Sequence, residues 1–138
     1  MYADALERET NRFERGEIAL ITPNEILTMI RADGFFERVF EKEEDWDAQL
    51  DARESTAFDA AWNSSYETIH KKDPTESATI RDIREYVFKQ TFRLTQNSEL
   101  ASYVSDDLGL IAKAFDSKLA NAFVSRLWNS YLQGQFPK

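Results

Sequence analysis

The chain has 138 residues, of which 42% are hydrophobic and 30% are charged, and this is the size and composition of one folded domain. We therefore expect a single domain over residues 1–138. The 25 acidic residues outnumber the 17 basic ones and give a net charge of -8, which disfavours direct binding to nucleic acid. The sequence has no cysteine, so disulfides, thiolate metal sites and cysteine nucleophiles are excluded.

The beginning of the sequence and its apolar runs predict a cytoplasmic protein. Acidic residues stand where a secretory signal would carry a basic and then an apolar region. Charges interrupt every apolar run long before it could span a bilayer. The sequence also lacks a glycine-rich phosphate loop and the common hydrolase signatures. We expect no membrane contact, no cofactor and no bound metal.

The positions of the four glycines and three prolines are typical of helix starts and ends rather than of β-turns. They predict an all-α, single-domain bundle of six or seven helices. The clearest start is Thr22 before Pro23 and Glu25, which combines a cap, a first-turn proline and a glutamate that can reach back. Another helix should start near Pro74, capped by Asp73, or a turn later at Thr79. The predicted helices cover about residues 3–15, 23–33, 35–53, 55–71, 74–95 or 79–95, and 106–133, with a buried connector at 18–21 and a short turn at 100–104. The helices over 79–95 and 106–133 should be central.

Acidic residues concentrate between positions 33 and 59, where ten acids stand against three bases. On a helix over 35–53, six carboxylates cover an arc of about 160° opposite an apolar face. Such a ridge can steer a basic protein surface into contact, or imitate the phosphates of a nucleic acid. A solvated, solubilising helix face has the same pattern. The predicted partner-binding residues are Glu37, Glu41, Glu44, Asp45, Asp47 and Asp51.

Two further features leave alternatives open. Glu43 projects close to the apolar stripe of its helix, which indicates a helix break near residues 43–45, a partner such as an arginine, or a buried carboxylate with a raised pKa. Glu67 and His70 have the spacing found in carboxylate-bridged metal sites. However, His70 is the only histidine, and this favours a surface residue near a helix end.

The predicted helix over 106–133 carries two apolar faces. Its first half points in one direction, whereas the apolar residues after Phe123 centre about 150° away, too far for the drift of a straight helix. Either the helix bends near Asn121 and returns to the same core, or the second set makes a contact outside it, most simply in a homodimer. Phe136 is a further aromatic that could anchor an interface. The candidate interface residues are Val124, Leu127, Trp128 and Tyr131.

Three functions are compatible with these patterns. The leading hypothesis is a non-enzymatic binding protein whose acidic helix 35–54 engages a basic partner surface, as an inhibitor, an immunity-type antagonist or a nucleic-acid mimic would do. The second is an oligomeric structural or adaptor module that associates through its aromatic C-terminal helix. The third, an enzyme with a carboxylate-centred site, is disfavoured because the sequence assembles neither a nucleophile nor a metal set.

Overall fold

The computed structural model describes residues 21–138, and all regular structure within that range is helical. The all-α prediction is therefore confirmed, with seven helices and no strand among the described residues. The predicted helix over 3–15 and most of the connector at 18–21 lie outside this range. The helices are α2 (Pro23–Ile30), α3 (Phe35–Phe40), α4 (Trp46–Arg53), α5 (Thr56–Lys72), α6 (Ala78–Thr95), α7 (Ser98–Asp116) and α8 (Ala122–Leu132).

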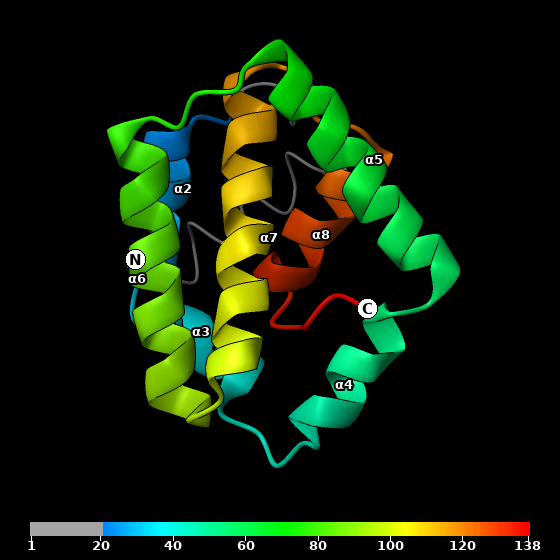
Figure 1. Ribbon diagram of the computed structural model, residues 1–138. Helices are drawn as coiled ribbons and strands as arrows, with labels where there is room; N and C mark the ends of the chain where they lie inside the picture. The colour runs from blue at the N-terminus through cyan, green and yellow to red at the C-terminus, as the bar shows by residue number, and fades with distance from the viewer. Residues whose placement is uncertain (1–20) are drawn as a thin grey trace.

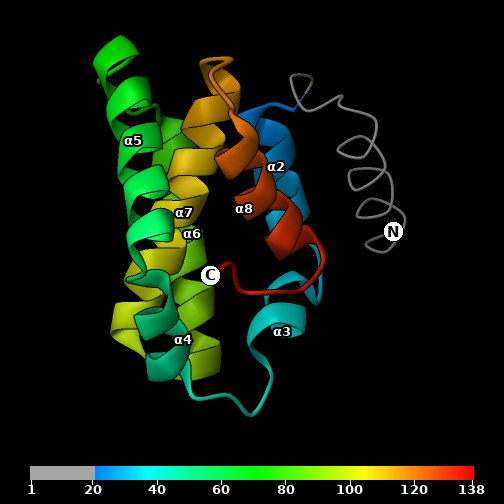
Figure 2. The same ribbon diagram turned by 90° about the vertical axis from the view of Figure 1, so that its right-hand side faces the viewer.

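Helix α7 lies at the centre of the molecule, and α6 packs antiparallel against it at one side (Figure 1); of the two helices expected to be central, only the one that contains α7 is. Twelve of the 19 residues of α7 are buried, because α6, α8, α2, α5 and α4 all pack against it. Figure 2 shows α8 beside α7, and in both views α4 lies at the lower end, below α5. Within residues 21–138, no helix combines the length and apolar content of a bilayer span.

Side-chain caps explain where most of these helices begin. Thr22 accepts a hydrogen bond from the Glu25 amide at 3.2 Å, and Pro23 starts α2 as predicted. The helix after Asp73 begins between the two predicted starts, at Ala78, because Ser77 caps α6 through the Ile80 amide. Asp73 instead accepts a hydrogen bond from the hydroxyl of Thr75 at 2.8 Å. The remaining side-chain caps are Asp45, Ser55, Asn97 and Asn121.

The single helix predicted over 35–53 is wrong, because the chain breaks between α3 and α4. Asp45 has an extended backbone and accepts a hydrogen bond from the Ala48 amide at 3.1 Å, so a new helix starts at Trp46. The break passes through residues 41–45, where the sequence left that alternative open. Glu43 lies exposed in this connection rather than buried as a carboxylate in the core.

The helix predicted over 106–133 is also two helices. The first of them starts earlier than predicted, because Asn97 caps α7 and the expected short turn at 100–104 belongs to it. The chain then breaks at residues 117–121, where Lys118 has a φ of 58°, and Asn121 caps α8.

This second break returns the C-terminal apolar residues to the main core. Trp128 and Tyr131 are 0% and 1% exposed, and the Trp128 ring stacks on Phe35 with centroids 6.2 Å apart. A second subunit could not reach these side chains without opening the fold. The expected interface is therefore corrected: the four residues involved are core residues of α8, namely Val124, Leu127, Trp128 and Tyr131.

Candidate functional site

The six predicted partner-binding carboxylates do not form one ridge, because the helix break separates them. Glu37 lies on α3 and faces α6, where it forms an ion pair with Arg93 at 3.0 Å. The other five carboxylates are exposed on the connection 41–45 and on α4. The structure therefore leaves Glu37 apart from the rest and groups Glu41, Glu44, Asp45, Asp47 and Asp51.

We call residues 41–54 the acidic segment. It contains seven acids and two bases, and both bases bond to other parts of the protein, although Lys42 remains exposed. The Lys42 Nζ donates a hydrogen bond to the carbonyl of Gly134 at 2.8 Å, and Arg53 is 6% exposed. The outer surface of the segment is consequently negative. Its exposed acids are Glu41, Glu43, Glu44, Asp45, Asp47, Asp51 and Glu54.

Local hydrogen bonds orient several of these carboxylates without neutralising them. Glu44 accepts a hydrogen bond from the Gln49 amide at 3.1 Å, and Asp45 caps α4. Asp47 accepts a long hydrogen bond of 3.4 Å from Asn97. No group of three or more His, Asp or Glu residues in the range 21–138 is placed to hold a metal ion. The arrangement is better suited to a broad cationic surface than to a single cation.

Beneath the acidic segment, a buried ion pair joins α4 to α7. Both terminal nitrogens of Arg53 donate to the Asp107 carboxylate at 2.7 Å. The same carboxylate accepts hydrogen bonds from the Trp62 indole at 2.9 Å and from the Tyr131 hydroxyl at 2.6 Å. Asp107 is fully buried, and its carboxylate accepts hydrogen bonds from side chains of three other helices. Four helices, α4, α5, α7 and α8, are therefore joined at one hydrogen-bonded carboxylate.

The electrostatics of this network keep Arg53 charged and Tyr131 neutral. Burial alone would lower the pKa of Arg53, but the charge and hydrogen bonds of Asp107 outweigh it and raise that pKa. Burial, followed by the charge of Asp107, raises the pKa of Tyr131 well above its ordinary value. The Arg53 guanidinium also lies over the rings of Phe58 and Phe136, at 4.6 and 5.0 Å.

The sequence pattern does not predict this network. Arg53 is one of the three bases of the acidic stretch, and the predicted helix over 106–133 puts Asp107 in its first turn, where an acid needs no partner. The available signal was Asn97 as an alternative cap. With the helix starting at 98, Asp107 falls on the buried stripe beside Val104 and Leu108, where a carboxylate requires a cation.

A groove of about 430 Å³ lies on another face, between α5, α6 and α7. The Tyr66 ring stacks between Trp62 and His70 along one wall. His70 is exposed in the last turn of α5, and neither it nor Glu67 belongs to a metal-binding cluster among residues 21–138.

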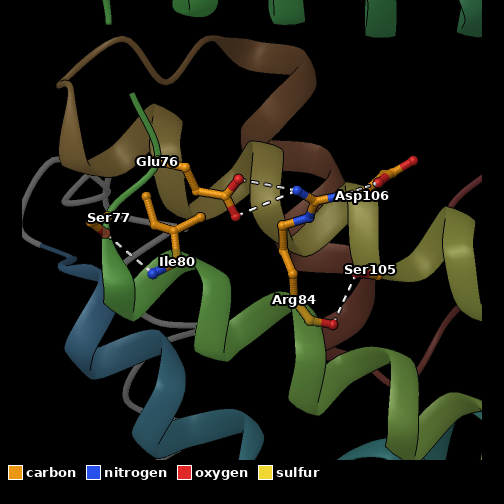
Figure 3. A network of polar contacts seen from close by, with 6 residues as sticks. All are labelled: Glu76, Ser77, Ile80, Arg84, Ser105 and Asp106. Atoms are coloured by element: carbon orange, nitrogen blue, oxygen red, sulfur yellow. Dashed lines mark hydrogen bonds and ion pairs between the residues drawn. The ribbon is translucent and has the colours of Figure 1, made fainter. Parts of the chain in front are cut away.

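On the opposite wall, Arg84 bridges two carboxylates (Figure 3). It lies 3.2 Å from Glu76 and 3.0 Å from Asp106. Partial burial raises the pKa of Asp106, and the charge of Arg84 opposes that shift. The Arg84 stem crosses α7 at Gly109, where an added Cβ would lie 2.8 Å from the Arg84 Cδ. The charges of this wall are satisfied by one another, so the groove has no strong preference for an anion or a cation.

Comparison with known proteins identifies one family. The family model of immunity protein PIM1 matches residues 25–138, which is all but the first 24 residues of the chain. The matched region includes every described helix except the first two residues of α2. No match is found among curated proteins.

Proposed function

The chain belongs to the immunity protein PIM1 family, and on that premise we propose that it binds a protein toxin and inhibits it through the acidic segment. The partner surface is basic. The observation that carries this proposal is the excess of exposed acids: Arg53 is buried and the exposed Lys42 is hydrogen-bonded to the Gly134 carbonyl, which leaves seven exposed acids around one exposed base. An inhibitor needs rapid capture of its target, and a single-sign surface accelerates association with an oppositely charged one.

The position of the segment supports the same function. In α4, Leu50 and Arg53 are buried and Trp46 packs against the core, whereas four of the eight residues are exposed, namely Asp47, Ala48, Asp51 and Ala52. Their side chains are therefore available to a partner without disturbing the fold. The alternative contact surface was the aromatic C-terminal helix, but its aromatic side chains are buried in the core of the same chain. The acidic segment is thus the better surface for a partner.

The test compares two triple charge reversals with the same change in net charge. One variant carries Glu41→Lys, Glu44→Lys and Asp51→Lys in the acidic segment. The matched control carries Glu67→Lys, Asp82→Lys and Asp116→Lys, at exposed acids on α5, α6 and α7. The probe is the protein encoded by the gene next to that of this chain, purified in an inactivated form, and association is followed by stopped flow from low to high salt.

We expect the segment variant to associate at least about tenfold more slowly at low salt, and its rate to depend less on salt than that of the wild type. At 0.1 M salt the control should change the rate much less than the segment variant does, because charges more than about 10 Å from the interface are screened there. Helicity should be unchanged in both variants, since exposed charges contribute little to stability. Equal effects of the two variants, or no effect of the first, would refute the acidic segment as the binding surface.

A further inference from the structure

The last five residues of the chain, 134–138, contact the acidic segment along its length, and we call them the tail. At one end, the Gly134 carbonyl accepts a hydrogen bond from Lys42 at 2.8 Å. At the other end, the Lys138 ammonium donates to the side chain of Gln49. Between them Phe136 is 8% exposed. The tail therefore contacts both the connection after α3 and the middle of α4.

Phe136 fills the space at the break between α3 and α4. Its ring lies 6.3 Å from that of Phe40, the last residue of α3, and 6.2 Å from that of Trp46, the first residue of α4. The Trp46 contact is edge-to-face, with an interplanar angle of 90°. The Arg53 guanidinium lies over the opposite part of the cluster, 5.0 Å from the Phe136 ring centroid. One side chain thus contacts both ends of α4.

A turn at the end of α8 directs the tail to this place. Gly134 has a φ of +72°, and a Cβ there would lie 3.3 Å from the Cβ of Arg38. The Gln135 amide returns to the Ser130 carbonyl at 2.8 Å, and the Arg38 guanidinium donates to the Leu132 carbonyl at 3.3 Å. These bonds fix the direction of the chain before Phe136.

We infer that Phe136 is a positioning residue for toxin binding: it holds the acidic segment in the one arrangement that the toxin recognises. The inference rests on the proposed function. Helix α4 has eight residues and buries only Leu50 and Arg53, so it is too short to be stable by itself. Without Phe136, Trp46 keeps its edge-to-face contact with Phe40 but loses the one with Phe136, and Arg53 loses one of its covering rings. The segment would then populate several arrangements, and the apparent affinity would fall by the fraction of time spent in the competent one.

The experiment uses Phe136→Ala in the full chain, with Phe88→Ala as a matched control. Phe88 is a half-buried aromatic on α6, stacked on Phe92. The first measurement is amide hydrogen exchange without a partner. Phe136→Ala should accelerate exchange in α4 about tenfold or more relative to α6 and α7, whereas Phe88→Ala should not. The second measurement is affinity for the inactivated product of the neighbouring gene, together with the salt dependence of association.

We expect the affinity of Phe136→Ala to fall about tenfold, as for a segment that is competent one-tenth of the time. The salt dependence should remain that of the wild type, because no charge has changed, and this separates a loss of position from a loss of charge. If the alanine variant does not fold, Phe136→Leu should show the same changes to a smaller extent.

Two results would overturn the inference. Equal acceleration of exchange in α4 and α7 would make Phe136 an ordinary core residue whose loss lowers global stability. Faster exchange in α4 with unchanged affinity would show that binding does not need the segment to be held. Neither result bears on the charge-reversal comparison, so failure of this inference and failure of the proposed function can be told apart.

Discussion

The buried Arg53–Asp107 pair offers a test of how the four helices are held together. Asp107→Leu leaves the Arg53 cation buried without an anion, which costs about 3–5 kcal/mol, and it also removes the acceptor of Trp62 and Tyr131. We expect a loss of at least about 4 kcal/mol in the free energy of unfolding. That is a large part of the roughly 5–15 kcal/mol that stabilises a typical domain.

The double variant, Arg53→Met with Asp107→Leu, removes both charges and leaves apolar side chains of similar volume. It should be more stable than the sum of the two single losses predicts, with a coupling energy of about 3 kcal/mol. Urea unfolding followed by far-ultraviolet circular dichroism measures all four corners of the cycle. Additive losses, with no recovery in the double variant, would show that Arg53 and Asp107 contribute independently and would refute the reasoning.

Two further stability predictions follow from single hydrogen bonds. The pKa of Tyr131 is raised in the folded state, so the stability that its protonated hydroxyl contributes is complete below pH 10 and is lost as the pH rises further. The free energy of unfolding of the wild type should therefore fall above pH 10, and Tyr131→Phe should make that fall less steep by up to about 1.4 kcal/mol per pH unit. Identical slopes in the wild type and the variant would contradict this. Thr22→Ala should cost about 1 kcal/mol through loss of the α2 cap, measured by urea unfolding, with Thr22→Ser as the control that restores the bond.

The sequence predicts this fold best where one local signal decides a boundary. Thr22 before Pro23 places the start of α2, and Ser55 the start of α5, because the cap and the first turn are adjacent in sequence. The two breaks are harder to place, because no proline or glycine interrupts the sequence at 41–45 or at 117–121. Their trace in the sequence is a conflict: Glu43 on an apolar stripe in one case, and an apolar face that swings by about 150° in the other.

The acidic segment can be predicted from the sequence more readily than the ion-pair network beneath it. A run of acids can be counted in the sequence, whereas its division at 41–45 is indicated only by the position of Glu43 on the apolar stripe. The ion pair joins residues 54 positions apart, and no local period encodes such a pairing. Asp107 can be recognised as buried only when Asn97 is chosen as the cap of its helix, because Leu100 and Val104 then belong to the same apolar stripe.

The shallow burial of α4 also affects how the sequence of this protein can change over generations. The residues that fix the backbone, Leu50 and Arg53, differ from those that face outward, among them Asp47 and Asp51. Substitution of the outward residues changes the surface chemistry at little cost in stability, because surface positions rarely shift it by more than about 0.5 kcal/mol. A lineage can therefore explore new partner specificities here one residue at a time, and a protein engineer can randomise these positions while keeping the scaffold constant.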